Sequence, residues 1–384
     1  MKVIEIREGS ALAELQEQWT DLLQRMPAAT VYQTWEWNHA WWSAYGRRKS
    51  LRLLLVHDGD ELVAIAPLYL SRHLGTPLRR LAYIGTGASD YLDVIADEQR
   101  APHACRALLS FLESARSHDL ADLQQIPEWS PLAHAVKHLR ASSCVARPLE
   151  ICPYVALPET WDVFIRGRGK RLRSNIAYYE RLLQRSFEQV ETVLVDKDGL
   201  DAGMTALFDL HGRRWRSRMM PGVLSGSATR RFHRDVAARF SDRGWLRLHA
   251  TRVDGKIVAG LYCFSYRRRY YYYLGGFEPA LGRYSIGTTL TASAIRQAIA
   301  EGCSEFDFLR GHEAYKYRWA PEERTNAQLL VPSTRRWRSS AMLRLNRLER
   351  RIESLAKAWS DRGKGSERQR ETSQATPSEG VQIT

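Results

Sequence analysis

A glycine-bearing segment in the second half of the chain has the composition of a phosphate-binding loop. It contains Gly275 and Gly276 and, after Arg283, runs through Ile286-Gly287-Thr288-Thr289 into a helix-like pattern. The first N–H groups of a helix have no partner within it and carry the positive end of the helix dipole. Amides at Gly287, Thr288 and Thr289 would therefore suit a pyrophosphate, and Gly287 adds no Cβ in its way. An ordinary capped helix start has the same pattern.

The elements predicted around this loop place it at one edge of a mixed sheet. Three strands are expected at 245–253, 257–266 and 270–275, followed by a helix at 286–301 and a strand at 305–309. The third strand and the strand after the helix can then lie parallel, joined by a right-handed crossover. This arrangement puts the start of the helix at the end of the third strand, where α/β sheets usually bind phosphates.

The first half of the chain repeats this pattern roughly 195 residues earlier. A hairpin is expected at 51–57 and 62–69, around Asp58-Gly59, followed by a strand at 81–85. Val63-Ala64 follows its turn much as Val258-Ala259 follows Asp254-Gly255. A duplicated domain is the favoured interpretation, and chance similarity between hairpins is the alternative.

Composition excludes several classes of protein. The chain has 384 residues, 44% of them hydrophobic, which favours two globular domains plus a tail. Apolar runs are strand-sized, and the charged N-terminus is unlike a signal peptide, so we expect a cytoplasmic protein. The five cysteines are widely spaced, which indicates reduced thiols, and the histidines form no pattern of metal ligands. We therefore expect no metal.

The net charge of +14 lies mainly in two segments. Residues 166–185 carry seven Lys or Arg against one Glu, and residues 335–384 carry twelve against six acids. In the second segment, apolar residues recur every three or four positions from Ala341 to Trp359, which predicts a basic helix with a narrow apolar stripe. That helix would dock on the body, pair with a second subunit or lie on anionic lipid. The Ser-, Thr- and Gly-rich end is expected to be disordered.

The combination of motifs resembles one family. The strand order, the loop and the segment 306–319 (FDFLRGHEAYKYRW) are similar to the CelD-type branch of the GNAT superfamily, associated with cellulose and exopolysaccharide biosynthesis. The tandem layout also resembles the Fem-type peptidoglycan aminoacyltransferases. Further matches are Thr34-Trp35-Glu36-Trp37, the basic stretch 170–175 and Arg214-Trp215. In one departure, Arg283 precedes Gly287 by one residue more than the common GNAT loop has.

The resemblance implies an acyl-CoA co-substrate, its pyrophosphate on the loop, and direct acyl transfer to an amine or hydroxyl. Such a transfer needs a base for the nucleophile, a donor for the oxyanion and an acid for the thiolate. The candidates that the resemblance places there are Asp307, Glu313, Tyr315 and Lys316. His312 as a base and Tyr317 as an acid are further options.

Each candidate has a structural alternative. Asp307, between two Phe rings, points away from both, where burial would raise its pKa toward that of a base or make it a structural carboxylate. Tyr315 donates a proton or packs in the core. Lys316 binds a phosphate or the oxyanion, or is an exposed lysine. His312 is otherwise a solvated loop residue.

The acceptor also has candidate ligands. Arg171, Arg173 and Asn175 would hold a phosphate-bearing acceptor, such as a nucleotide sugar, or form a solvated helix face. The tryptophans near residue 35 would stack on sugar rings or pack between domains. The residues taken as candidates to bind the acceptor are Arg171, Arg173, Asn175, Trp35, Trp37 and Trp215.

The fold class expected is a mixed-sheet α/β protein of tandem GNAT-like acyltransferase domains with a C-terminal basic helix. Its divisions are a degenerate domain at 1–160, a catalytic domain at 161–334, a basic helix at 335–362 and a tail at 363–384. The function implied is acyl transfer from acyl-CoA to a carbohydrate-related acceptor in exopolysaccharide or envelope biosynthesis. Its rivals are a Fem-like aminoacyltransferase that uses charged tRNA, and a non-catalytic scaffold that binds a polysaccharide-synthesis partner or a membrane.

Overall fold

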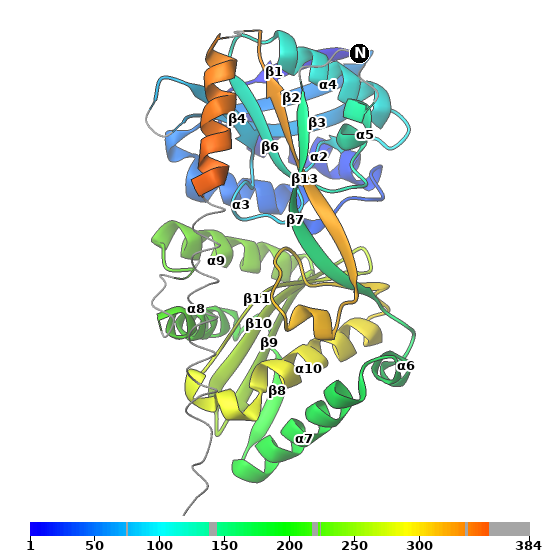
Figure 1. Ribbon diagram of the computed structural model, residues 1–384, viewed down its shortest axis with the longest axis vertical. Coiled ribbons are helices and arrows are strands. Elements are labelled where there is room, and N and C mark those ends of the chain that lie inside the picture. Colours follow the sequence, from blue (N-terminus) through cyan, green and yellow to red (C-terminus); the bar gives the residue numbers. More distant parts are fainter. Residues whose placement is uncertain (74–75, 138–143, 217–221, 223, 335–336, 353–384) are drawn as a thin grey trace, which may run out of the picture.

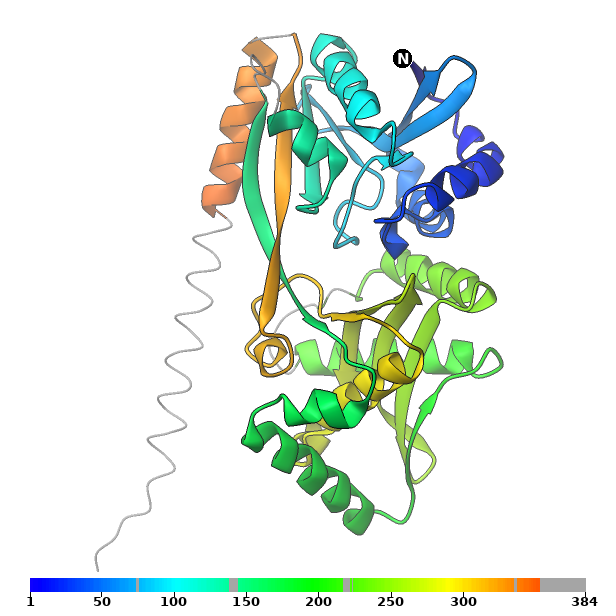
Figure 2. The same ribbon diagram turned by 90° about the vertical axis from the view of Figure 1, so that its right-hand side faces the viewer.

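Strand-sized apolar segments from both halves of the chain join into one mixed sheet, as a computed structural model shows (Figure 1). The structure describes residues 1–73, 76–137, 144–216, 222, 224–334 and 337–352. The sheet runs through two halves stacked along the long axis of the molecule, and helices cover its faces (Figures 1 and 2). Its strand order is β1-β2-β3-β4-β6-β13-β7-β12-β11-β10-β9-β8, with β5 beside β3.

The elements of the first half are, in chain order, β1 (Lys2–Ile6), α1 (Ala11–Glu14), α2 (Gln16–Gln24), η1 (Val31–Gln33), α3 (Trp35–Tyr45), η2 (Gly46–Arg48), β2 (Ser50–Asp58), β3 (Glu61–Arg72), β4 (Arg79–Tyr83), β5 (Ile95–Ala96), α4 (Ala101–Ser114), β6 (Leu120–Ile126), α5 (Pro131–Lys137) and β7 (Val145–Ala156). The elements of the second half are α6 (Trp161–Arg166), α7 (Lys170–Ser186), β8 (Val190–Leu194), α8 (Leu200–Arg216), α9 (Ser227–Asp242), β9 (Leu246–Val253), β10 (Lys256–Tyr266), β11 (Arg269–Phe277), η3 (Pro279–Tyr284), α10 (Ile286–Ala300), β12 (Glu305–Asp307), η4 (Lys316–Arg318) and β13 (Glu322–Pro332). Helical residues 337–352 follow.

The two halves share the register of their hairpins. Val56 pairs with Ala64 in the first hairpin, and Thr251 pairs with Ala259 at the same place in the second. In both hairpins the register shifts directly beyond that pair, on the side of the turn. The two predicted hairpins are thus present, with a bulge at the same place in each.

The halves exchange their last strands. β7 follows the elements of the first half but pairs antiparallel with β12, while β13, the last strand of the chain, pairs antiparallel with β6. β7 and β13 also pair with each other over most of their length, and both run from one half into the other (Figure 2). The expected boundary at residue 160 therefore divides the chain but not the sheet.

An aromatic core joins the halves on the face covered by α3, α8 and α9. Thr34 caps α3 by accepting a hydrogen bond from the Trp37 amide. The Trp37 ring is fully buried, with centroid distances of 5.0 Å to Phe232 and 5.7 Å to Tyr273. Its indole N–H donates to the Ser89 hydroxyl at 2.8 Å. This core fixes one half against the other.

In the first half, the chain itself fills the gap between the parallel strands β4 and β6. These strands pair at only two positions, and the Leu92 amide then donates to the Gln125 carbonyl at 2.8 Å. Leu92 and Val94 belong to the core cluster under α4. The corresponding gap in the second half lies between β11 and β12.

Helical residues 337–352 pack against the first half, so docking on the body is the alternative that the structure bears out. Met342 is 1% exposed and packs with Leu78, Leu120 and Leu330. Arg338 Nε lies 2.9 Å from Asp119 Oδ1. Leu355, Trp359 and the expected tail at 363–384 lie outside the described residues. No helix in the described part of the chain is long and apolar enough to span a membrane.

A buried carboxyl in the filled gap gives a prediction about stability. Asp93 Oδ1 accepts hydrogen bonds from the Ser130 hydroxyl and the Val94 amide, and burial raises its pKa from 3.8 to about 7. The folded state therefore binds more protons than the unfolded state, and stability is lost as the pH rises through this range. Relative to the wild type, Asp93→Asn should gain on the order of 2–4 kcal/mol in unfolding free energy between pH 4 and pH 8. Urea unfolding at both pH values measures this, and an equal pH dependence in the two proteins would contradict it.

Candidate active site

A cavity of ≈ 230 Å³ lies between β10 and β11, the start of α10 and the segment around η4. Glycines and the backbone around them form the wall at one end, and aromatic rings form the wall at the other end. The lining residues are Ala259, Gly260, Leu261, Tyr272, Gly275, Gly276, Phe277, Gly282, Ser285, Ile286, Gly287, Thr288, Leu290, Thr291, Tyr315, Arg318 and Trp319. None of them is acidic, so the cavity suits an anionic ligand.

The cavity exists because β11 and β12 separate. These strands pair in parallel at only three positions, the last of which is Tyr271 with Asp307. β11 continues to Phe277, and it bulges against β10 where the register shifts between Tyr262 and Cys263. The two strands thus lie parallel, as expected, and separate beyond this pair.

The start of α10 forms one wall. Ser285, just before the helix, adopts a left-handed conformation with φ of +46°. Its carbonyl accepts hydrogen bonds from the amides of Thr288 and Thr289, so the prediction that these two amides are free is wrong. The amides of Ile286 and Gly287 have no hydrogen-bond partner within the described part of the chain, and they stand at the positive end of the helix dipole. The anion-binding groups are thus displaced toward the helix start.

Most of the residues predicted to bind the cofactor line the cavity, and two do not. Gly275, Gly276, Ile286, Gly287 and Thr288 line it. Arg283 is exposed and donates to the Tyr284 hydroxyl at 2.8 Å. The Thr289 hydroxyl donates to the Ile286 carbonyl inside the helix. The inferred contacts of Arg283 and Thr289 with the ligand are therefore not part of this site.

Packing explains why residue 276 is glycine. A Cβ there would lie 2.6 Å from the backbone nitrogen of His211 on α8, a distance that neither backbone can relax. The helix therefore lies directly against β11 behind the cavity. A Cβ at Gly287 would meet only the Phe277 ring, at 3.7 Å.

Asp307 lies on the opposite side of the sheet from the cavity. It is fully buried, and its carboxylate accepts from the Tyr91 hydroxyl and the Leu309 amide, both at 2.7 Å, and lies 3.4 Å from Arg324 Nη1. Burial raises its pKa to about 6, and Arg324 opposes that shift. The alternation of side chains was predicted correctly, but the face that Asp307 occupies belongs to the junction of the halves. Asp307 therefore lies outside the cavity, among buried partners of the kind that the structural alternative expects.

Lys316 and Glu313 hold the segment that crosses the cavity. Lys316 is 4% exposed, and its ammonium group donates to the carbonyls of Leu309 and Arg310 and pairs with Glu313 at 3.0 Å. The ammonium group is directed to its own segment, so the predicted contact of Lys316 with a phosphate or an oxyanion does not fit, nor does Glu313 as a base. His312 Nδ1 lies 3.0 Å from the Tyr317 hydroxyl at the surface. Tyr315 is the predicted catalytic residue that reaches the cavity.

The sequence interpretation missed three side chains of the cavity, Tyr272, Arg318 and Trp319. The Tyr272 ring stacks on Phe308, with a centroid distance of 5.5 Å, and lies 6.2 Å from Tyr315. The alternation that separates Asp307 from its Phe neighbours also places Tyr272 on the cavity face. That signal was present in the sequence.

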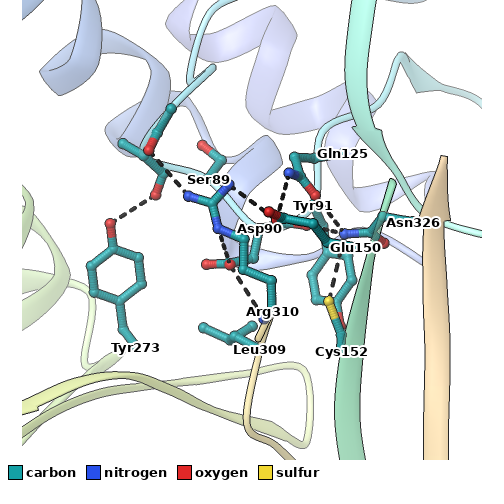
Figure 3. Close-up of polar contacts among 12 residues, drawn as sticks. Ser89, Asp90, Tyr91, Gln125, Glu150, Cys152, Tyr273, Leu309, Arg310 and Asn326 are labelled. Carbon is teal, nitrogen blue, oxygen red and sulfur yellow. Dashed lines mark hydrogen bonds and ion pairs between the residues drawn. The ribbon is translucent and has the colours of Figure 1, made fainter. Parts of the chain in front are cut away.

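A polar network anchors the end of β12 to the first half (Figure 3). Arg310 Nε lies 3.0 Å from Asp90 Oδ1 and its Nη1 lies 3.5 Å from Glu150. The Tyr273 hydroxyl donates to the Ala88 carbonyl at 2.7 Å. Asn326 donates to the Asp90 carbonyl at 2.6 Å. The loop of the first half thus supports one wall of the site in the second.

The residues predicted to bind the acceptor are dispersed. Trp35 is 6% exposed and Trp37 is fully buried, so neither offers a ring to a sugar, and packing between the halves is the correct alternative. Arg171 and Arg173 are exposed on α7, which packs on α10 through Leu172 and Ile176. They and Asn175 do not line the cavity. Trp215 lies on α8, and its side chain is outside the described part.

One family model matches part of the chain. The family described as "Acetyltransferase (GNAT) domain" matches residues 170–317, which are under half of the chain. These residues are similar to that family, and we call them the GNAT domain after it. The GNAT domain contains β11, α10, β12 and the cavity.

In the described residues, no group of three or more His, Cys, Asp or Glu side chains is placed to hold a metal ion.

Solved structures share the fold of the whole chain, GNAT domain included. FemX is 12% identical with a TM-score of 0.57, and the match covers 85% of this chain and 97% of that protein. L-PGS from Bacillus licheniformis is 14% identical with a TM-score of 0.54, covering 91% and 98%. The C-terminal domain of a putative lysylphosphatidylglycerol synthetase from Agrobacterium fabrum is 15% identical with a TM-score of 0.54, covering 86% and 95%. No curated protein matches the sequence. The expected fold class is confirmed.

The placement of Asp307 predicts a loss of stability when its carboxylate is removed. Asp307→Ala leaves the Tyr91 hydroxyl and the Leu309 amide without an acceptor, while Arg324 keeps its bonds to Glu305, and a buried group left unsatisfied costs about 1–3 kcal/mol. We expect a decrease of roughly 2–4 kcal/mol in unfolding free energy, measured with urea. The folded protein should bind acyl-CoA as the wild type does. Loss of turnover with unchanged stability would restore Asp307 as the base.

Proposed function

We propose that the protein transfers an acyl group from acyl-CoA to an amine or hydroxyl, with the donor held in the cavity of the GNAT domain. One observation carries this proposal, the convergence of the Ile286 and Gly287 amides on a cavity that no acidic side chain lines. A pyrophosphate at this helix start would accept from both amides. The pantetheine arm would then lie along β11, where the strands separate.

The side chains of the cavity define how the transfer would proceed. The acceptor attacks the thioester carbonyl, the C–S bond breaks, and the thiolate takes a proton. Tyr315 and Tyr272 bring phenol groups to the aromatic end of the cavity and are the candidates to supply that proton. The residues that line the cavity include no carboxylate or imidazole, so we assign the role of base to none of them. The carbohydrate-related acceptor rests on the resemblance alone.

A Fem-like aminoacyl transfer from charged tRNA is the second candidate function. The exposed Arg171 and Arg173 on α7 favour it, since phosphates of a polynucleotide attract such a face. The shared fold of FemX and of L-PGS is compatible with it. A scaffold without turnover, the third option, would bind neither donor.

Calorimetry distinguishes these functions. Acetyl-CoA, longer acyl-CoAs and an aminoacyl-tRNA are titrated into the full chain at two salt concentrations. The proposal expects saturable binding of an acyl-CoA. Binding of tRNA that weakens steeply with salt, without binding of any acyl-CoA, would replace it with the Fem-like function.

A substitution at the helix start tests the place of the pyrophosphate. Thr288 is the third residue of α10 and lines the cavity. An aspartate there is favourable for the helix dipole but faces the phosphates of the ligand. Thr288→Asp should weaken acyl-CoA binding on the order of 100-fold or more, because juxtaposed like charges cost several kcal/mol. Calorimetry measures the affinity, and thermal unfolding should show an intact fold.

The matched control is the same substitution at the same position of another helix. Thr229 is the third residue of α9, which lies outside the cavity. Thr229→Asp should leave the affinity for acyl-CoA unchanged. Equal affinities in the two variants would place the pyrophosphate elsewhere.

A further inference from the structure

A second cavity lies between the C-terminal helix and β7, outside the GNAT domain. Its volume is ≈ 490 Å³, and its lining residues are Arg147, Arg344, Arg347, Leu348 and Arg351. Guanidinium groups thus converge here without a lining carboxylate. Like charges that lie this close repel one another, and a bound anion would relieve that repulsion.

Arg147 lies among positive charges. Burial lowers its pKa, and Arg350 and Arg347 lower it further, while Asp122 opposes them. Arg147 Nη2 donates to Asn346 Oδ1, but its buried Nε has no hydrogen-bond partner in the described part of the chain. A donor is therefore left for a group that the protein itself does not supply.

The outward face of the same helix carries exposed apolar side chains. Trp337 is 73% exposed, Leu348 54% and Ile352 57%. Their spacing of four and seven residues places them on one face with Arg344. The opposite face, with Met342 and Asn346, is buried against the first half. We call Arg147, Trp337, Arg344, Arg347, Leu348 and Ile352 the C-terminal basic surface.

We propose that the C-terminal basic surface binds an anionic membrane surface, with a lipid phosphate in the arginine cavity. Arginines interleaved with exposed aromatic and aliphatic side chains are typical of a helix that lies in the plane of a membrane interface. Arg147 completes the phosphate site from β7, so the docked helix is the binding form. RNA would use the arginines but would leave Leu348 and Ile352 in water, so the lipid surface is favoured. This binding goes beyond acyl transfer and does not depend on it.

Vesicle flotation with the full chain tests the proposal. The protein should float with vesicles of phosphatidylglycerol and phosphatidylcholine in equal parts, and not with phosphatidylcholine alone. The double variant Arg344→Gln, Arg347→Gln should bind the anionic vesicles roughly 30-fold more weakly, because each basic side chain near such a surface contributes about 1 kcal/mol. The control with the same charge change is Arg47→Gln, Arg48→Gln, on exposed η2, which should bind as the wild type does.

The apolar part is tested separately. Leu348→Ser should weaken vesicle binding roughly 5-fold through lost apolar burial. Val163→Ser, at a residue 53% exposed on α6, is its control and should have no effect. All four variants should keep the affinity of the wild type for acyl-CoA, which separates this proposal from the function of the GNAT domain.

Three results would overturn the proposal. If the double arginine variant bound anionic vesicles as the wild type does, the arginine cavity would have no part in membrane binding. Saturable binding of inorganic phosphate with no affinity for vesicles would make the cavity a site for a free anion. Tight binding of transfer RNA that the double variant loses, without vesicle binding, would make the surface a nucleic-acid site.

Discussion

The short parallel contact between β11 and β12 is the constraint on which the site depends. Three paired positions are enough to fix β12 in the sheet, because β7 pairs with it on its other side. Beyond Asp307 the strands separate, and the backbone that would have been paired becomes the wall of a cavity. A longer ladder would close the cavity. The first half has the same short contact, but Leu92 and Val94 of its own chain occupy the gap. Whether a ligand can enter is thus decided by the segment that follows β4 or β11.

Much of this arrangement was predictable from the sequence because local chemistry determines it. The Asp-Gly turns predicted two hairpins, and the order of strands around the helix at 286–301 placed the glycine-bearing loop at the edge of the sheet. The free amides were expected at Gly287, Thr288 and Thr289. In the described part of the chain, the amides without a partner are those of Ile286 and Gly287. That error arose because Ser285 takes a left-handed conformation, so its carbonyl accepts from Thr288 and Thr289. A backbone conformation of a single serine has no clear signature in a residue pattern.

The residues that were misassigned are those whose surroundings come from distant parts of the chain. The face of β12 toward which Asp307 points was predicted correctly. Tyr91, more than two hundred residues earlier in the chain, covers that face. Lys316 bonds to carbonyls of its own segment, and Trp37 packs against helices of the other half. Periodicity gives the direction of a side chain relative to its own element. It does not give which residues from distant segments pack against that side chain. Here the exchange of β7 and β13 between the halves determines those residues.

The exchanged strand also sets an order of events during synthesis. β6, complete at residue 126, must wait for β13 at residues 322–332 before its edge is paired. An unpaired edge is a template for pairing with other chains, and contacts of such long sequence separation form slowly. The N-terminal half therefore leaves the ribosome before the strand that closes it exists. Its final folding is coupled to the arrival of the C-terminus, and a chain that stops before residue 322 exposes this edge to aggregation.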